Sequence, residues 1–400
     1  MPAKCAAPRA TAHLSQEYRT PAWEQRKLGE LYQKNDERNT DGLGSERTLS
    51  VASMTFNSAG NGADDSSLPN YKRLRLGDIA FEGHTNKEFA YGRFVLNDAG
   101  NGIMSPRFTC LRPIVEQEYS FWKYFIHSEK VMRPILVNST KSGTMMNELV
   151  VEDFLKQEIL VPSLPEQRRI GAFFDRLDSL ITLHQRKYDK LCVLKKSMLD
   201  KMFPKGGSLY PEIRFAGFTD PWEQRKLGEL FEEHSEKDRD DLPALTIIQG
   251  GGTVHRDESN RNLQFDRNSL SNYKVVDTGD FIVHLRSFEG GLEKATCCGL
   301  VSPAYHIFRG KNVDSDFYYL YFRSKRFIDA DLKPHVYGIR DGRSIDIEGM
   351  KTIFIPWTNL AEQRRIGAFF DHLDSLITLH QRKLELLRNI KKSMLDKMFV

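Results

Sequence analysis

Residues 166–203 read EQRRIGAFFDRLDSLITLHQRKYDKLCVLKKSMLDKMF, and residues 362–399 read EQRRIGAFFDHLDSLITLHQRKLELLRNIKKSMLDKMF. The two stretches are offset by 196 residues and are identical at 31 of 38 positions. In both, apolar residues recur at intervals of three and four, which is typical of one face of an α-helix. Each copy therefore predicts one helix, about 55 Å long at 1.5 Å per residue.

A helix of this length is too long to be covered by one small domain, and its narrow apolar stripe suits a partner helix over several heptads. The other copy is the obvious partner, and the chain between the copies is long enough to reverse direction. We therefore expect the two helices to pair antiparallel within one chain. The residues that we expect in this coiled-coil interface are Ile170, Phe173, Leu177, Leu180, Leu191 and Leu194 in the first copy and Ile366, Phe369, Leu373, Leu376, Leu387 and Ile390 in the second.

A second repeat opens each half of the chain. WEQRKLGEL at residues 23–31 returns unchanged at residues 222–230, so the whole chain is a tandem duplication. Between opening and helix the halves share only landmarks, such as Gly77-Asp78 and Gly279-Asp280, and their short alternating runs predict α+β domains rich in short strands. We expect strands near 78–81, 108–111, 158–161, 281–285, 305–308 and 352–355, and aromatic helices at 121–127 and 317–323. The predicted organisation is a tail at 1–19, variable domains at 20–161 and 205–357, and helical spacers at 162–204 and 358–400.

Composition narrows the class of protein. Five cysteines form no CxxC pair, no apolar run is long enough to cross a membrane, and the N-terminal segment lacks the apolar core of a secretion signal. We therefore expect a reduced, cytoplasmic protein without a zinc site. The net charge is +4, and its basic excess lies on the two predicted helices, where Lys and Arg can simply solvate a coiled-coil exterior.

No catalytic constellation is evident. The chain has no GxxxxGK[ST] motif for a nucleoside triphosphate, and its histidines are scattered without the spacing of metal ligands. The functional signal that remains is a set of basic side chains in the variable domains, since Arg and Lys clamp phosphates and read base edges. The candidates for DNA contact are Lys72, Arg73, Arg75, Arg93, Arg107, Lys141, Arg256, Arg286, Lys333, Arg340 and Arg343.

The arrangement of variable domain, long helix, variable domain and long helix, with WEQRKLGEL opening each domain, resembles the specificity (S) subunit of bacterial type I restriction-modification systems. The resemblance covers residues 20–400. It implies two target recognition domains, each reading one half of a bipartite and asymmetric DNA site. It also implies a pseudo-two-fold arrangement in which the antiparallel coiled coil fixes the gap between half-sites and docks two modification subunits.

In that family, the modification subunits use S-adenosylmethionine to methylate adenine, and restriction subunits that use ATP and Mg join the complex. The resemblance thus implies that this chain binds double-stranded DNA and partner subunits but no cofactor. One departure from the family pattern is visible: YPEIRFAGFTDPW at 210–222 resembles the usual lead-in, whereas only RTPAW precedes the motif at 19–23. Two alternatives stay open, namely a self-contained methyltransferase or nuclease and a coiled-coil scaffold without DNA readout.

Overall fold

The computed structural model of the chain describes residues 23–57, 62, 64–143, 146–258, 267–284, 287–338 and 344–399. The chain divides into two compact units, one made of residues 1–184 with 383–400 and the other of residues 185–382. Both units combine helices with short antiparallel strands, which confirms the predicted α+β class. The division falls inside both long helices, so each unit contains the first part of one long helix and the last part of the other.

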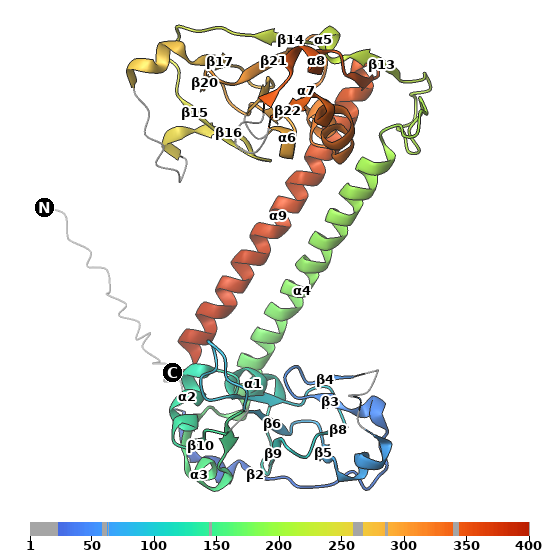
Figure 1. Cartoon of the computed structure of the whole chain (residues 1–400). Helices are drawn as coiled ribbons and strands as arrows, with labels where there is room; N and C mark the ends of the chain where they lie inside the picture. Colours follow the sequence, from blue (N-terminus) through green and yellow to red (C-terminus); the bar gives the residue numbers. More distant parts are fainter. Residues whose placement is uncertain are drawn as a thin grey trace, which may run out of the picture. The chain divides into compact units, whose positions relative to one another are not determined.

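The two predicted long helices are α4 (Leu164–Lys201) and α9 (Leu360–Met398). In each unit the start of one lies beside the end of the other (Figure 1). Phe174 of α4 packs on Phe399 after α9 in the first unit, with 5.8 Å between ring centroids. In the second unit, Lys195 Nζ near the end of α4 lies 2.5 Å from Asp374 Oδ1 near the start of α9. The helices therefore run antiparallel, as predicted.

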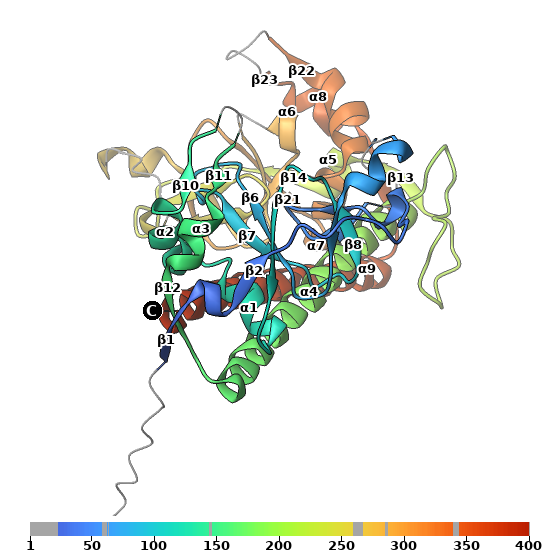
Figure 2. The same cartoon turned by 90° about the horizontal axis from the view of Figure 1, so that it is seen from below.

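A four-stranded antiparallel sheet lies at the centre of the first unit. Its order is β2 (Tyr32–Lys34), β9 (Thr109–Pro113), β6 (Ile79–Glu82) and β7 (Arg93–Leu96), so the strands predicted near 78–81 and 108–111 are confirmed with small shifts. Helices α2 (Glu129–Val137) and α3 (Val151–Lys156) lie at one end of this unit and β8 (Gly102–Met104) at the other (Figures 1 and 2). The other elements are β1 (Glu24–Lys27), η1 (Leu28–Glu30), η2 (Ser45–Arg47), β3 (Leu49–Ser50), β4 (Thr55–Phe56), η3 (Asp65–Asn70), β5 (Lys72–Leu74), α1 (Tyr119–Phe125), β10 (Thr140–Lys141), β11 (Glu148–Leu149) and β12 (Glu158–Val161).

The second unit repeats this plan. Its sheet has the order β14 (Phe231–His234), β21 (His306–Gly310), β18 (Phe281–Val283) and β19 (Glu293–Lys294). The predicted aromatic helices are α1 in the first unit and α7 (Ser315–Phe322) in the second. The other elements are β13 (Glu223–Lys226), α5 (Leu227–Leu230), β15 (Leu245–Ile248), β16 (Gly252–His255), η4 (Arg256–Glu258), η5 (Arg267–Asn272), β17 (Lys274–Val276), α6 (Ser287–Gly290), β20 (Gly299–Val301), η6 (Phe327–Leu332), η7 (Lys333–His335), β22 (Val336–Tyr337), β23 (Ser344–Ile345), α8 (Ile347–Lys351) and β24 (Phe354–Trp357).

The duplicated opening motif closes each domain onto its long helix. Strand β1 pairs antiparallel with β12, from Glu24 opposite Val161 to Lys27 opposite Glu158, and β13 pairs with β24 in the same way. Because β12 and β24 lead directly into α4 and α9, the motif joins the beginning of each domain to the strand before its helix. This role explains why the motif is retained in both halves.

The end of each long helix is held by an aromatic cluster. In the first unit, Phe399 is fully buried and its ring lies 5.9 Å from Phe121 and 5.3 Å from Phe125 of α1. In the second unit, Phe203 stacks on Phe317 of α7 at 5.2 Å. Burial of one such ring stabilises the fold by about 1.5–3 kcal/mol. The last residue of the duplicated stretch is therefore an anchor for the neighbouring domain.

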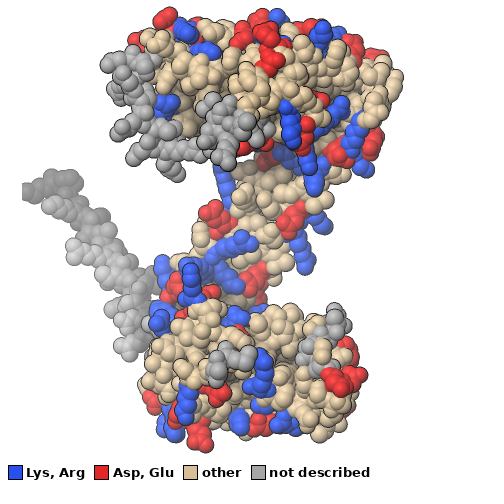
Figure 3. Space-filling view, in the orientation of Figure 1, with Lys and Arg blue, Asp and Glu red and all other residues tan. Residues whose placement is uncertain are grey.

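Charge is mixed over the surface. On the face shown in Figure 3, Lys and Arg side chains lie among Asp and Glu side chains on both units. The described residues on this face therefore form no continuous basic surface.

Candidate nucleic-acid interface

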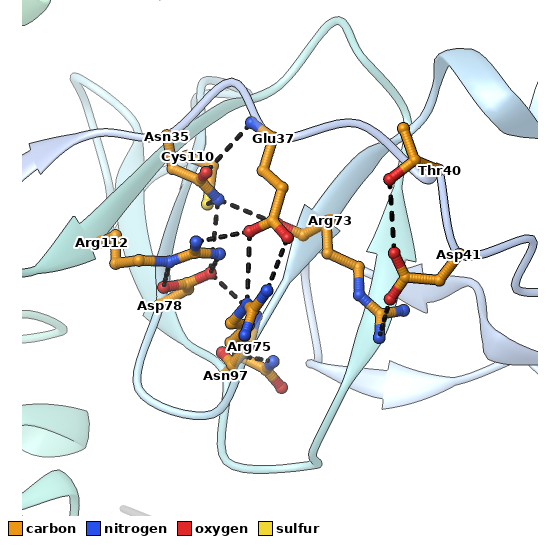
Figure 4. Close-up of polar contacts among 10 residues, drawn as sticks. All are labelled: Asn35, Glu37, Thr40, Asp41, Arg73, Arg75, Asp78, Asn97, Cys110 and Arg112. Atoms are coloured by element: carbon orange, nitrogen blue, oxygen red, sulfur yellow. Dashed lines mark hydrogen bonds and ion pairs between the residues drawn. The ribbon is translucent and has the colours of Figure 1, made fainter.

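A charged network joins the turn before β6 to β9 in the first unit (Figure 4). Asp78 is 1% exposed and accepts from Arg112 at 3.0 Å (Nε to Oδ1) and 2.9 Å (Nη2 to Oδ2), and the amide of Arg75 donates to Asp78 Oδ2 at 2.8 Å. Glu37 accepts from Arg75 Nη2 at 2.7 Å and from Arg112 Nη1 at 2.5 Å. The hydrogen bond from Arg75, followed by that from Arg112, lowers the pKa of Glu37 to about 2. The network thus places two arginines at fixed positions.

The second unit contains the same buried pair. Arg309 donates to Asp280 at 2.9 Å (Nε to Oδ1) and 2.8 Å (Nη2 to Oδ2), and the amide of Asp277 donates to Asp280 Oδ2 at 2.8 Å. The hydrogen bond that Arg309 donates to Asp280 is the main cause that raises the pKa of the Arg309 guanidinium above its ordinary value. Because a buried charge is tolerated only when it is paired, this pair accounts for the shared landmark at Asp78 and Asp280. The pair joins the turn before β18 to β21.

Two predicted DNA ligands are engaged inside the first unit. Lys72 and Arg73 are only 7% and 8% exposed, because every residue of β5 is buried. Lys72 Nζ lies 3.1 Å from Asp36 Oδ1, and Arg73 Nη2 lies 3.1 Å from Asp41 Oδ2. Arg73 is therefore not presented to DNA as expected, because its strand is buried in the fold. Lys72 is also mostly buried, but it borders a cavity of this unit.

Two further candidates for DNA contact, Arg75 and Arg93, form internal contacts but keep part of their side chains exposed. Arg75 has a side chain that is 58% exposed although it pairs with Glu37. Arg93 donates from Nη2 to the Ala52 carbonyl oxygen at 3.2 Å, and its guanidinium lies 5.2 Å from the Phe89 ring centroid. Both guanidinium groups are thereby oriented, and Arg75 keeps most of its surface in solvent.

Arg107 is the candidate that lines a groove. It is exposed, its guanidinium lies 4.9 Å from the Phe108 ring centroid, and it borders a cavity of about 840 Å³ in the first unit. The polar and charged side chains that also line this cavity are Lys34, Lys72, Thr109, Asn147, Glu148 and Glu152. Lys141, another candidate, is exposed on β10 outside this wall. Lys34, Thr109 and Asn147 were missed because nothing in the sequence indicates that they share a groove.

In the second unit, the described candidates are Arg256 and Lys333. Arg256 is half-buried and lies 5.9 Å from the Tyr273 ring centroid, and Lys333 is exposed at the start of η7. The candidates Arg286, Arg340 and Arg343 lie outside the described residues, as does most of the loop that contains the last two. The structure therefore places two of these five candidates.

The long helices bury part of the predicted interface. Ile170 and Leu177 of α4 belong to the core of the first unit, and Ile366 and Leu373 of α9 belong to that of the second. Other predicted interface residues are partly buried, namely Leu191, Phe369, Leu376, Leu387 and Ile390. The duplication therefore places matching residues of the two copies in matching cores.

Three predicted interface residues are instead exposed. Phe173, Leu180 and Leu194 retain 39%, 36% and 38% of their surface, which corrects their assignment to the interface between the helices. A pair of helices covers only a narrow seam, so apolar residues at its margins stay in solvent. Sequence periodicity cannot distinguish the seam from its margin when both are apolar.

Ion pairs between the helices were not predicted. Lys391 Nζ donates to Asp178 Oδ1 at 2.6 Å in the first unit, and Lys195 Nζ donates to Asp374 Oδ1 at 2.5 Å in the second. The four residues are related by the duplication, because Asp178 matches Asp374 and Lys195 matches Lys391. The signal was present in the sequence as a charge pair that both copies retain.

Within the described ranges, no group of three His, Cys, Asp or Glu side chains could hold a metal ion. Cys110, Cys192, Cys297 and Cys298 are free thiols, and burial raises the pKa of Cys110 to about 12. A search of the helices in the described part of the chain finds none with the length and apolar character to span a bilayer.

The chain is similar to several known proteins. Residues 22–192 match the family model described as type I restriction modification DNA specificity domain. The chain is 24% identical over 292 residues to the type I restriction enzyme MjaVIII specificity subunit of Methanocaldococcus jannaschii, covering 68% of either chain. It is 22% identical over 346 residues to the putative MjaX specificity subunit of the same organism, covering 81% of this chain and 78% of that one. The chain is thus similar to type I restriction-modification specificity subunits.

Solved structures were also compared with the chain. The HsdS subunit from Thermoanaerobacter tengcongensis gives a TM-score of 0.48 at 20% identity, over 95% of this chain and 97% of that one. The type I restriction-modification S subunit from M. genitalium gives a TM-score of 0.47 at 14% identity, over 94% and 96% of the two chains.

Proposed function

We propose that each variable domain reads one half of a bipartite, asymmetric DNA target and that the long helices set the gap between the halves. The observation that carries this proposal is a duplicated frame with different side chains on it. Asp78–Arg112 and Asp280–Arg309 have the same geometry, whereas the residue next to the pair is Arg75 in one unit and Asp277 in the other. What differs between half-sites must be read by what differs between domains.

The groove beside Arg107 is the best-supported reading surface in the first unit. It combines Arg107 with Lys34, Lys72, Thr109 and Asn147, and such side chains form hydrogen bonds with base edges and phosphates. Glu148 and Glu152 line the same groove, and carboxylates can accept hydrogen bonds from cytosine. In the second unit, Arg340 and Arg343 keep the role predicted from the sequence. Changing either to Ala is expected to weaken one half-site by about 1–3 kcal/mol if the arginine contacts a base edge.

We further propose that the long helices dock two modification subunits. Large apolar side chains remain exposed along them, and exposed apolar residues are a feature of protein interfaces. In the first unit these are Phe173, Leu180, Leu183, Leu386 and Met394, and in the second they are Val193, Leu194 and Leu379. Leu183 and Leu379 are counterparts in the duplication and are 46% and 44% exposed, so two copies of one partner would meet the same side chain in each unit.

Catalysis would then reside in the partner subunits. This chain has no sequence motif for a nucleoside triphosphate, so S-adenosylmethionine, ATP and Mg are assigned to the modification and restriction subunits. The purified chain alone is therefore expected not to methylate DNA. Methyl transfer by the isolated chain would instead support a self-contained methyltransferase.

A segment exchange tests whether each variable domain reads its own half-site. Residues 231–358 are replaced with the corresponding segment of a related specificity subunit, and the methylated motif is determined by methylome sequencing of cells that carry the complete system. One half of the motif is expected to change, whereas the other half and the gap stay constant. A change in both halves or in the gap would contradict the proposal, and methylation independent of sequence would favour a scaffold.

A further inference from the structure

The lead-in of the second unit packs on the start of α9. Arg214 donates to Glu362 at 2.7 Å (Nε to Oε1) and 2.8 Å (Nη2 to Oε2), and Glu362 is fully buried. The two parallel hydrogen bonds between a guanidinium and a carboxylate fix the direction of approach as well as the charge. Glu362 is thus a specific receptor for an arginine.

The residues on either side of Arg214 complete this contact. The amide of Ile213 donates to the carbonyl oxygen of Lys201 at 3.0 Å. The ring of Phe215 packs edge-on against Phe369 with 5.8 Å between centroids, and the Arg365 guanidinium lies 5.1 Å from the centroid of the Phe215 ring. Three consecutive residues, Ile-Arg-Phe, are therefore recognised by a backbone oxygen, a carboxylate and an aromatic ring.

The first unit carries the same receptor groups. The counterparts of Glu362, Arg365, Phe369 and Lys201 are Glu166, Arg169, Phe173 and Lys397, which are the same four residue types at the matching positions. Phe173 is 39% exposed, and among the described residues its ring partner is its neighbour Phe174. The aromatic part of the receptor is therefore open to solvent in the described part of this unit.

The carboxylate of the first unit has a different hydrogen-bond donor. Trp23 Nε1 donates to Glu166 Oε1 at 3.1 Å. The matching Trp222 Nε1 is buried and has no partner among the described residues, because Glu362 binds Arg214 instead. An arginine that bound Glu166 would compete with the indole N–H of Trp23 for this carboxylate. The indole N–H of Trp23 would then lose its acceptor, which is the state of Trp222 in the second unit.

We propose that Glu166, Arg169, Phe173 and the carbonyl oxygen of Lys397 form a binding site for an extended peptide segment with the sequence character of Ile-Arg-Phe, supplied by a partner molecule. Arg214 and Phe215 lie eight and seven residues before Trp222, whereas Ser15 and Gln16 lie at these distances before Trp23. Neither Ser15 nor Gln16 can supply a guanidinium or an aromatic ring. In a second copy of the chain, Arg214 is already bound to its own Glu362, which favours a separate partner.

A synthetic peptide tests the site. A fluorescein-labelled peptide with the sequence of residues 208–219, SLYPEIRFAGFT, is titrated with the full chain, and binding is followed by fluorescence anisotropy. Saturable binding at one site per chain is expected. Phe173→Ala and Glu166→Gln should each weaken binding about ten-fold, the scale of a hydrogen bond to a charged group. Leu183→Ala, which removes an exposed apolar side chain from the same helix, is the matched control and should leave the affinity unchanged.

The peptide offers its own control. Replacing the arginine that corresponds to Arg214 with Ala should abolish binding, because the peptide then has no guanidinium to donate hydrogen bonds to the Glu166 carboxylate. The indole N–H resonance of Trp23, assigned by its loss in Trp23→Phe, should shift when the peptide binds, because Glu166 exchanges one donor for another.

Several results would overturn the proposal. They are absence of binding, equal affinity for wild type and Phe173→Ala, or binding without a shift of the Trp23 resonance. Binding that appears only after residues 1–22 are deleted would assign the site to that segment of the chain itself. Concentration-dependent self-association that Arg214→Ala abolishes would assign the site to a second copy.

Discussion

The two units hold their sheets in the same way and differ immediately beside the shared contacts. Arg112 binds Asp78 at 3.0 and 2.9 Å, and Arg309 binds Asp280 at 2.9 and 2.8 Å. Next to these pairs, the first unit has an arginine bonded to Glu37, whereas the second has Asp277 bonded to Arg309. The duplication therefore preserves the groups that hold the fold and allows the neighbouring charge to change sign.

The starts of the long helices show the same division. Gln167 Nε2 donates to the Pro162 carbonyl oxygen at 2.9 Å, and its Oε1 accepts the amide of Glu118 at 3.2 Å. In the second unit, Gln363 accepts the amide of Asp314 at 2.9 Å and donates to the Thr358 carbonyl oxygen at 2.6 Å. Both glutamines are buried. The EQRRIG motif thus connects a helix to its domain in addition to supporting the helix pair.

The largest expected effect comes from charge in the helix seam. Leu177 and Leu373 are 7% and 4% exposed, so changing either to Asp buries an unpaired carboxylate at a cost of several kcal/mol. Both variants are expected to unfold at lower temperature by similar amounts. Leu183→Asp is the control, because Leu183 is 46% exposed on the same helix as Leu177. An unchanged melting temperature for both seam variants would contradict the assignment of these leucines to matching cores.

The shared arginine pair gives the next largest effect. Arg112→Ala leaves the Asp78 carboxylate buried without its guanidinium, and breaking such a pair costs about 3 kcal/mol. Arg309→Ala is expected to cost a similar amount because its geometry is the same. Urea unfolding measures both free energies. If one variant lost several kcal/mol of unfolding free energy and the other lost none, the two pairs would not contribute equally to stability despite their similar geometry.

Much of the frame could be predicted from the sequence. The long helices, the two aromatic helices and the strands at residues 158–161 and 306–310 follow from periodicity and from the duplication, because each pattern is local. The antiparallel pairing also follows, since two long apolar stripes in one chain need partners. The helix ion pair between Asp178 and Lys391 was not predicted, because it depends on the register between the helices.

The candidate DNA site was harder to predict. Arg73 has the residue type of a DNA ligand, but its strand is buried in the fold. Conversely, Lys34 and Asn147 line the groove beside Arg107 although they are more than 100 residues apart in the sequence. Which basic side chains face a common surface is a property of tertiary packing. Composition alone cannot supply it.

A smaller effect is expected at Arg107. Arg107→Ala should weaken binding of one half-site by about 1–3 kcal/mol if the guanidinium contacts a base edge, and it should leave stability unchanged because the side chain is exposed. Arg73→Ala should do the reverse, since Arg73 is buried beside Asp41. Electrophoretic mobility shifts with the assembled complex and DNA altered in one half-site at a time measure the first effect. Equal losses on both halves would contradict a role confined to the first unit.

The smallest expected effect is the pH dependence of stability that Glu37 causes. Its partner Arg75 has no equivalent in the second unit, where Asp277 stands at the matching position. In the folded protein its pKa is about 2, below the ordinary value of 4.5, chiefly because Arg75 donates a hydrogen bond. Because the pKa is lowered in the folded protein, the Glu37 carboxylate stabilises the fold at pH values above 4.5. This stabilisation is lost as the pH falls from about 4.5 to about 2. Solvent screening limits it to about 1 kcal/mol or less.

Glu37→Gln is therefore expected to lower the free energy of unfolding at pH 7 and to match wild type near pH 2, as measured by urea unfolding at a series of pH values. Glu236→Gln in the second unit is the matched control. Its carboxylate is 43% exposed and lies 3.5 Å from Arg239, so the loss at pH 7 should be smaller. If Glu37→Gln and wild type differed equally at pH 7 and pH 2, the contribution of Glu37 would not depend on its charge. The contrast between Arg75 and Asp277 would then have no energetic consequence for the carboxylate.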